Sequence, residues 1–289
     1  MSDPAARDAA EEASALSHPA VAPDASAAYG DHPDQVVDFY APRDGRTSAP
    51  LVVALHGGVW RAPYDRQHVS PFADFLARRG FAVANVEYRR GSDIPRQGGT
   101  APVAGRWPET FDDIATALDA IPELAAAHLP SADPRRIVLT GHSAGGHLAL
   151  WAAARHVLPA GSAWRLPAPP ALRGVVALAP IAHFGRAVEL DVCGGGVTEF
   201  LGGKGHLADR MPFADPSVLV PTGIATTVVQ GRGDIVVPHA VAEAYVTAAA
   251  EAGEMVGFTL LEDVGHFPLI DPAADACAVV AEEIAQLAW

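Results

Sequence analysis

From Val36 onward, short apolar runs alternate with longer stretches rich in Ala and Leu. Short runs that are apolar throughout are typical of strands covered on both faces, and the stretches between them are long enough for helices. The pattern therefore predicts an α/β fold built of βα units around a mostly parallel sheet. The expected strands are 36–40, 51–55, 82–86, 137–140, 175–178, 225–230 and 257–261. The expected helices cover about 70–79, 109–128, 144–156, 239–253 and 272–287.

The two ends of this pattern suggest a domain organisation. Residues 1–29 are rich in Ala, Ser, Asp and Pro and have few bulky apolar groups, so they bury too little surface to offset the entropy of ordering them. We expect a mobile amino-terminal arm there, with a lid over the site as the alternative, and one α/β domain over residues 30–289. Residues 181–221 are too long for a simple connection and predict a small cap or insertion at the carboxyl edge of the sheet, with a flexible excursion as the alternative.

Composition excludes several classes of partner. The net charge is −14 and the chain has no basic run, which argues against a nucleic-acid or anionic membrane surface. No apolar stretch approaches the ~20 residues that cross a bilayer, and the first residues lack the basic and apolar regions of a secretory signal. We therefore expect a cytoplasmic protein. Cys193 and Cys277 are too few for a disulfide scaffold and match no zinc spacing, so we interpret them as ordinary thiols and expect no metal site.

The pentapeptide 141–145, Gly-His-Ser-Ala-Gly, stands between the expected strand 137–140 and the expected helix that follows it. A serine alcohol is a poor nucleophile at neutral pH, so it has to be exposed on a sharp bend beside a base and beside oxyanion donors. The two glycines make such a bend sterically feasible. This context predicts a nucleophile elbow with Ser143 as the nucleophile.

An acid and a histidine follow Ser143 in the order that a serine hydrolase on this scaffold requires. Asp234 lies on a turn after the expected strand 225–230 and would orient the imidazole. His266 lies on a loop after the last expected strand and would act as general base and then general acid. Asp263 and Asp271 are alternative acids, but neither lies on a separate loop at the end of a strand.

The segment 56–60, His-Gly-Gly-Val-Trp, closes the expected strand 51–55. Because Gly57 and Gly58 have no side chains, backbone N–H groups there can approach a reacting carbonyl oxygen. We expect an oxyanion hole formed by the N–H of Gly58 or Val59 together with that of Ala144, the residue after the nucleophile. A tight turn is the structural alternative for this segment.

Several aromatic and charged residues beside these motifs are candidates either for packing or for contact with substrate. Trp60 either packs in the core or lines the substrate pocket, where it would favour an aryl group. His142 shapes the elbow and is a second candidate for the pocket, whereas His147 is placed on the following helix. The residues after the strand 82–86, Tyr88, Arg89 and Arg90, are expected at the solvated rim.

These motifs together resemble the α/β-hydrolase superfamily, and the match runs from about Val36 to the carboxyl end. Within it, the string His-Gly-Gly-Val-Trp is similar to the His-Gly-Gly branch that holds hormone-sensitive-lipase-type esterases and kynurenine formamidases. Trp60 favours the formamidase-like side, which carries His-Gly-Gly-x-Trp. The resemblance implies a twisted, mostly parallel sheet of about eight strands, no cofactor, and an acyl-enzyme mechanism with Ser143, Asp234 and His266 as the triad.

We therefore expect a serine hydrolase that cleaves a small carboxylic ester, with an aryl formamide such as N-formylkynurenine as the alternative substrate. A hydrolase fold kept as a binding module with an inert triad is the alternative from another class, although all three triad residues are in place. The expected partner is a small ester or amide molecule. The oligomeric state stays open, with a homodimer as one alternative.

Overall fold

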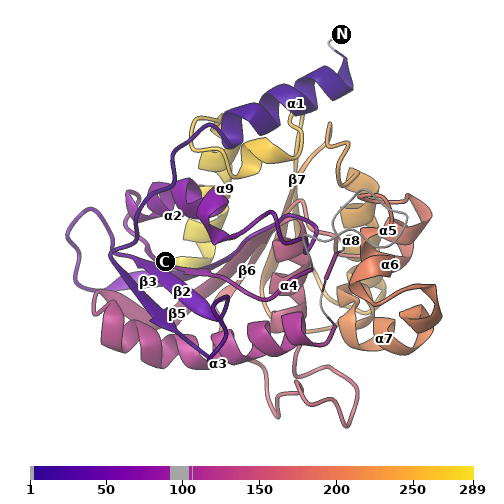
Figure 1. Ribbon diagram of the computed structural model, residues 1–289, viewed down its shortest axis with the longest axis horizontal. Helices are drawn as coiled ribbons and strands as arrows, with labels where there is room; N and C mark the ends of the chain where they lie inside the picture. Colours follow the sequence, from indigo (N-terminus) through magenta and orange to yellow (C-terminus); the bar gives the residue numbers. More distant parts are fainter. Residues whose placement is uncertain (1–2, 92–103, 106) are drawn as a thin grey trace.

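An eight-stranded sheet forms the centre of the computed structural model, which describes residues 3–91, 104–105 and 107–289 (Figure 1). Its strands are β1 (Ala25–Ala28), β2 (Val36–Tyr40), β3 (Ala49–Leu55), β4 (Ala82–Val86), β5 (Ala132–His142), β6 (Gly174–Leu178), β7 (Thr226–Gly231) and β8 (Gly257–Leu261). The helices are α1 (Pro4–Ala15), α2 (Ser70–Ala77), α3 (Glu109–His128), α4 (Ala144–Ala153), α5 (Phe184–Glu189), α6 (Gly196–Phe200), α7 (Leu207–Ala214), α8 (His239–Glu251) and α9 (Asp275–Ala288). The expected α/β-hydrolase fold with about eight strands is confirmed.

The strands lie in the order β1-β2-β4-β3-β5-β6-β7-β8. The β1–β2 and β2–β4 pairs are antiparallel, and every other neighbouring pair is parallel. The register of the central pair aligns Leu55, the last residue of β3, with Gly141 near the end of β5. The loops that leave the carboxyl ends of β3, β5, β7 and β8 therefore converge on one edge of the sheet, which is where open α/β sheets bind ligands.

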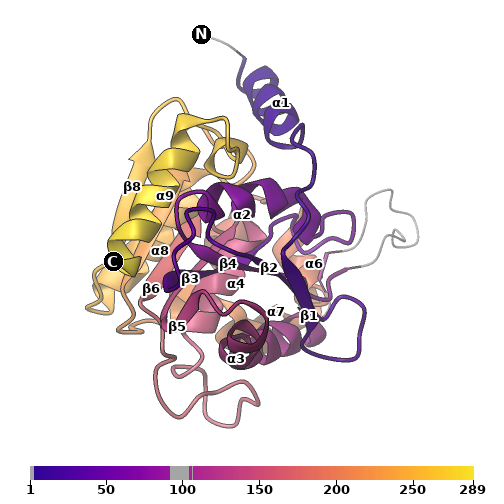
Figure 2. The ribbon, with the colours of Figure 1, turned by 90° about the vertical axis from the view of Figure 1, so that its left-hand side faces the viewer.

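Alternate side chains of the strands point into two apolar layers, as the two-residue period of a strand requires. Leu51 and Val53 of β3 belong to the layer under α3, α4 and α8, whereas Val52 belongs to the layer under α2 and α9. Figure 2 shows the sheet between these two helical layers. Both faces are covered, which explains why the strands are apolar throughout their length.

The amino-terminal segment is the main departure from the expected fold. In place of a mobile arm, residues 4–15 form α1 and residues 25–28 form β1, which pairs with β2 at the edge of the sheet. Asp3 caps α1 by accepting a hydrogen bond from the N–H of Ala5, and Pro4 occupies the first turn. The argument from low hydrophobicity was wrong because α1 is held by polar contacts with the carboxyl-terminal third of the chain rather than by a large apolar face.

Residues 181–221 form a small helical insertion between β6 and β7 that contains α5, α6 and α7. Phe184 and Phe200 of this insertion are buried against the ring of Trp60, which fixes the insertion to the loop after β3. Within the described residues, no helix combines the length and the apolar character needed to cross a membrane.

Candidate functional site

Ser143 lies at the junction between β5 and α4, with φ 56° and ψ −116°. A non-glycine residue at positive φ is strained, and such strain is common where a nucleophile is exposed at a turn. The junction is held by hydrogen bonds from the Ser143 N–H to the Leu178 carbonyl at 2.8 Å and from the His147 N–H to the Ser143 carbonyl at 3.1 Å. The bend therefore depends on the neighbouring strand β6 as well as on its own residues.

The flanking glycines are required by close packing around the elbow. A Cβ atom at Gly145 would collide with the backbone carbonyl oxygens of Leu55 and His56, and one at Gly141 would collide with the Gly145 carbonyl. The elbow is consequently pressed directly against the end of β3. This contact brings Ser143 next to the loop that follows β3.

Asp234, on the loop after β7, holds the ring of His266, on the loop after β8. Its Oδ2 lies 2.7 Å from Nδ1 of His266, and both side chains are buried. The Oδ1 atom accepts hydrogen bonds from the N–H groups of Val236 at 2.9 Å and Val237 at 2.8 Å. Gln230 also donates to Oδ2 at 3.1 Å. An acceptor at Nδ1 keeps the proton on that nitrogen and leaves Nε2 free to take a proton from an alcohol.

The alternative acids are placed elsewhere. Asp263 is exposed at the turn after β8. Asp271 binds the amino-terminal segment, with Ser14 Oγ 2.6 Å from its Oδ2 and His18 Nε2 2.7 Å from its Oδ1. Asp234 is therefore the carboxylate that contacts the His266 ring.

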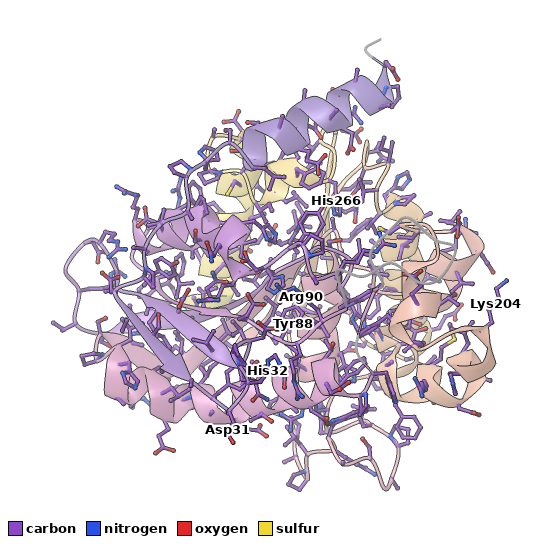
Figure 3. All side chains as sticks on the ribbon, viewed as in Figure 1. Asp31, His32, Tyr88, Arg90, Lys204 and His266 are labelled. Atoms are coloured by element: carbon purple, nitrogen blue, oxygen red, sulfur yellow. The ribbon has the colours of Figure 1, made fainter. Side chains whose placement is uncertain are left out.

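A cavity of about 290 Å³ joins these pieces. Ser143 and His266 both line it, as do Gly58 and Val59 of the loop after β3. Figure 3 shows His266 on the side of the domain that faces α1. The predicted nucleophile, its base and part of the expected oxyanion loop therefore line the same cavity.

The backbone of the loop after β3 has the left-handed conformation at three successive residues, with φ 99° at Gly58, 55° at Val59 and 54° at Trp60. The loop passes so close to the elbow that a Cβ atom at Gly57 would lie 2.9 Å from the His142 carbonyl oxygen and 3.3 Å from Cβ of Ser143. Successive residues with such turned conformations can form a concave array of N–H groups, which is the kind of backbone that an oxyanion hole requires.

The remaining predicted donor belongs to Ala144, which follows Ser143 as the first residue of α4 and is buried. The N–H groups in the first turn of a helix have no partner within the helix, and the helix dipole favours negative charge there. Gly58 and Val59 line the cavity with Ser143, and Gly57 passes close to Ser143.

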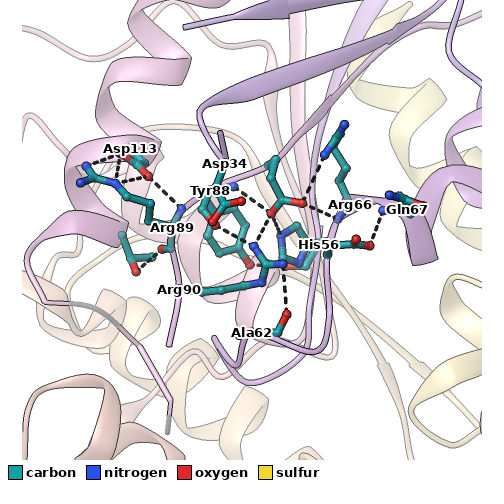
Figure 4. A network of polar contacts seen from close by, with 12 residues as sticks. Asp34, His56, Ala62, Arg66, Gln67, Tyr88, Arg89, Arg90 and Asp113 are labelled. Carbon is teal, nitrogen blue, oxygen red and sulfur yellow. Dashed lines mark hydrogen bonds and ion pairs between the residues drawn. The ribbon is translucent and has the colours of Figure 1, made fainter. Parts of the chain in front are cut away.

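A buried polar network around Glu87 supports His56, the first residue of the loop after β3 (Figure 4). Glu87 Oε1 lies 2.9 Å from Nε2 of His56 and accepts hydrogen bonds from Arg90 at 2.6 Å and from the N–H of Tyr88 at 3.0 Å. The Tyr88 hydroxyl donates to the His56 carbonyl at 2.6 Å, and the two rings stack 4.2 Å apart. Burial alone would raise the pKa of Glu87, but the charges of His56 and Arg90 and their hydrogen bonds outweigh it and lower that pKa to about 2.

This network corrects the expectation for the segment after β4. Tyr88 and Arg90 are buried rather than placed at a solvated rim, because they pack around Glu87 and His56. Arg89 is half-buried and forms an ion pair of 2.7 Å with the fully buried Asp113 of α3. Sequence reasoning did not identify Glu87, although an acidic residue directly after an apolar strand was the available signal.

Trp60 does not line the cavity. Its ring is buried and stacks on Phe200 at 4.1 Å, with edge contacts to His147 at 5.2 Å and Phe184 at 6.2 Å. The packing reading is therefore the correct one, and the proposal that Trp60 touches substrate is wrong for this geometry. Its place in the core also explains how the insertion at 181–221 supports the loop.

His142 does line the cavity, beside Ser143. Its Nε2 lies 3.0 Å from the His266 carbonyl oxygen, and burial, followed by the nearby His266 ring, lowers its pKa well below the usual value. His68, on the same cavity wall, has its pKa lowered to about 4, chiefly by burial. Both imidazoles are therefore neutral at pH 7 and add no positive charge to the cavity.

A further wall of the cavity comes from α1, in the segment where a lid over the site was the alternative to a mobile arm. Asp8, Glu12 and Leu16 from this segment line the cavity together with Cys193 of the insertion. Burial raises the pKa of the Cys193 thiol to about 11, so it is protonated at pH 7. Among the residues that the structure describes, no group of three His, Cys, Asp or Glu side chains is arranged to hold a metal ion.

The chain is similar to known proteins at three levels. The family model described as BD-FAE matches residues 37–248. A probable isoprenylcysteine alpha-carbonyl methylesterase of Oryza sativa subsp. japonica is 32% identical over 124 residues, which cover 43% of this chain and 27% of the relative. The probable carboxylic ester hydrolase LipM of Mycobacterium tuberculosis is 32% identical over 108 residues, which cover 37% of this chain and 22% of the relative. The matches thus span about a quarter of the length of these curated relatives.

Solved structures share the fold over nearly the whole chain. Esterase B from Lactobacillus rhamnosis has a TM-score of 0.72 at 20% identity, covering 99% of this chain and 96% of that one. A truncated carbohydrate esterase from gut microbiota has a TM-score of 0.69 at 18% identity, covering 91% and 96%. At these identities the likeness establishes the architecture.

Proposed function

Because this chain belongs to the BD-FAE family, with a match from residue 37 to residue 248, we propose that it is a serine hydrolase that cleaves a small carboxylic ester. The observation that carries the proposal is the 2.7 Å contact between Asp234 and His266. The His266 ring in turn lines the same cavity as Ser143. The similarity to a methylesterase and to LipM supports ester chemistry over amide chemistry.

In the proposed reaction, Nε2 of His266 removes the proton from Ser143 as the serine oxygen attacks the acyl carbonyl carbon. The developing oxyanion is held by N–H groups of the loop at 57–59 and by that of Ala144. His266 then gives its proton to the departing alcohol, which leaves an acyl group on Ser143. Water, activated by the same imidazole, releases the acid and restores the serine.

Asp234 stabilises this cycle without exchanging a proton. Its two backbone hydrogen bonds to Oδ1 leave Oδ2 for the imidazole, so the ring is held in one tautomer and the imidazolium that forms is paired with a buried negative charge. Loss of one oxyanion donor from such a site costs ~3 kcal/mol of transition-state stabilisation.

The decisive test compares Ser143→Ala with wild type on short-chain 4-nitrophenyl esters. We expect the variant to lose turnover and to lose labelling by a fluorophosphonate probe, whereas wild type is labelled with one probe per chain. Ser48→Ala, at an exposed serine outside the cavity lining, serves as the matched control. Full ester turnover by Ser143→Ala would contradict the proposal, and a wild type that resists the probe would favour the inert binding module.

An aryl formamide is the second candidate substrate, because the string His56–Trp60 fits the His-Gly-Gly-x-Trp branch of the superfamily. The buried position of Trp60 removes the direct contact with an aryl group that made this alternative attractive. We therefore expect kcat/KM on N-formylkynurenine to be far below that on short nitrophenyl esters. A higher kcat/KM on the formamide would reverse the order of the two candidates.

A further inference from the structure

Helix α1 is fixed over the cavity by contacts with the loops after β7 and β8, at the carboxyl edge of the sheet. Ser14 and His18 both bind Asp271, at 2.6 and 2.7 Å. Glu11 accepts a hydrogen bond of 3.3 Å from the N–H of Gly265, the residue before His266. The indigo helix at the top of Figure 1 accordingly lies against the yellow carboxyl-terminal segment.

Arg7 adds a further attachment on the same side. Its guanidinium donates to the carbonyl of Gly233, the residue before Asp234, and forms an ion pair of 3.6 Å with Glu11. Arg7 therefore holds the helix, and its positive charge also acts on the neighbouring Asp8. The two residues that α1 adds to the cavity wall within its own length are both acidic, Asp8 and Glu12.

Asp8 is the more constrained of these two carboxylates. Its Oδ1 atom is buried without a hydrogen-bond partner. Desolvation raises its pKa, an effect that the nearby His266 and Arg7 partly offset and that Asp234 reinforces. Asp8 as a whole is half-buried, and a carboxylate oxygen without a donor is stabilised by a cation placed beside it.

The other walls offer little positive charge to neutralise these acids. Of the described residues that line the cavity, Arg61 is the only one with a permanent positive charge. It donates to the Cys193 carbonyl at 3.1 Å and lies 3.7 Å from Glu199, so its charge is partly compensated. His68 and His142 are neutral at pH 7, as described above. The part of the cavity wall that α1 supplies therefore carries two acidic side chains and no basic one.

We propose that the Ser143 cavity selects esters that carry a positive charge, and that Asp8 and Glu12 of α1 are the residues that recognise it. This inference rests on the proposed ester hydrolysis and names the class of its substrate. An ammonium group on the substrate would lie against α1, while the ester carbonyl lies at Ser143. Neutral esters of the same shape enter without that attraction, and anionic ones are repelled.

The test uses pairs of esters that differ only in charge. One pair carries the cation in the alcohol, butyrylcholine against 3,3-dimethylbutyl butyrate. The other carries it in the acyl group, 4-nitrophenyl 4-(trimethylammonio)butanoate against 4-nitrophenyl 5,5-dimethylhexanoate. In each neutral ester a carbon replaces the quaternary nitrogen, so the ratio of the two kcat/KM values reports charge recognition alone. For at least one pair, we expect a ratio of roughly ten or more at low salt, because clefts lined by one sign of charge concentrate the opposite ion.

The double variant Asp8→Asn/Glu12→Gln should bring that ratio close to one. Its matched control, Asp209→Asn/Glu123→Gln, removes two acids from exposed positions on α7 and α3 and should keep the wild-type ratio. Thermal unfolding checks that both variants are folded. If the first variant does not fold, Glu12→Gln alone is measured, and the wild-type ratio is followed as NaCl rises to about 0.5 M, where screening should lower it.

Two results would overturn the inference: a wild-type ratio near one for both pairs, or an equal fall of the ratio in the control variant. Both are distinct from failure of the proposed function. If neither member of a pair is hydrolysed in a way that depends on Ser143, ester hydrolysis itself is wrong. If the neutral esters are hydrolysed by Ser143 and the ratio is one, only the charge selection is wrong.

Discussion

Oδ2 of Asp234 lies 2.7 Å from Nδ1 of His266, although the two residues are on loops that follow different strands. The strands β7 and β8 are parallel neighbours, so their carboxyl ends and the loops beyond them lie together. The carboxylate is fixed by backbone N–H groups of its own turn before it meets the imidazole. The orientation of the histidine is therefore set by the backbone of the β7 loop.

Replacement of Asp234 by Asn should lower kcat on a short nitrophenyl ester by roughly 10⁴-fold, because an amide that donates to Nδ1 fixes the wrong tautomer. Steady-state kinetics at pH 7 check this. Asp263→Asn removes an exposed acid from the loop of the same histidine and should leave kcat near wild type. Equal losses in the two variants would argue against the assignment of Asp234.

Glu87→Gln should lower kcat by up to roughly 100-fold with a smaller change in KM, because the loss of its charge loosens His56 and with it the N–H groups at 57–59. The measurement is kcat and KM on one ester, together with the unfolding temperature. Glu123→Gln, on the exposed side of α3, is the matched control. Unchanged kcat in a folded Glu87→Gln protein would show that the network does not position the loop.

Gly145→Ala should destabilise the protein by roughly 3 kcal/mol, because its Cβ atom would overlap the carbonyl oxygens of Leu55 and His56. Gly205 is a suitable control, since a Cβ atom there meets nothing within 4 Å and the residue is exposed in a short 3₁₀ helix. Gly205→Ala should change the free energy of unfolding by less than about 1 kcal/mol. Urea unfolding of both variants measures the difference, and similar stabilities would contradict the tight contact between the elbow and β3.

Stability should fall as the pH drops below about 6.5, because burial lowers the pKa of His147 to about 3. Between those values the unfolded chain binds a proton that the folded chain does not, which favours unfolding by about 1.4 kcal/mol per pH unit. His147→Gln should remove this part of the slope in unfolding free energy, measured by urea titration from pH 7 to pH 4. His206→Gln, at an exposed position, should retain it; a slope unaffected by the first substitution would show that His147 does not carry it.

Glu87 should add a second loss of stability in more acidic solution. Its pKa is about 2 when folded and 4.5 as an ordinary side chain, so its contribution is complete above about pH 4.5 and is lost as the pH falls toward 2. The acid unfolding profile of Glu87→Gln, compared with that of Glu123→Gln, tests this sign. Identical profiles for the two variants would contradict it.

The central strands and the elbow were predictable from the sequence because their signals are local. The apolar runs of β2, β4 and β8 coincide with their expected ranges, as does α3. The order of Ser143, Asp234 and His266 along the chain, together with strand ends, was enough to predict that Ser143 and His266 line one cavity and that Asp234 contacts the His266 ring. The fold turns this order into proximity because parallel strands present their carboxyl ends at one edge.

The rest depends on contacts between distant segments. Asp3 and Pro4 carried a local signal for the start of α1, but the attachment of that helix depends on partners near residues 233, 265 and 271. The burial of Arg90 depends likewise on Glu87 and on a carbonyl in the loop after β3. The periodicity of a helix or strand does not indicate such distant partners.

The attachment of α1 also determines when, during synthesis, the wall over Ser143 can form. Arg7, Glu11 and Ser14 bind positions that lie 226 to 257 residues later in the chain, so their partners are made long after them. The sheet can begin to form while the wall over Ser143 is still missing. A nascent chain therefore exposes its nucleophile to the surroundings until the carboxyl-terminal loops emerge and α1 settles on them.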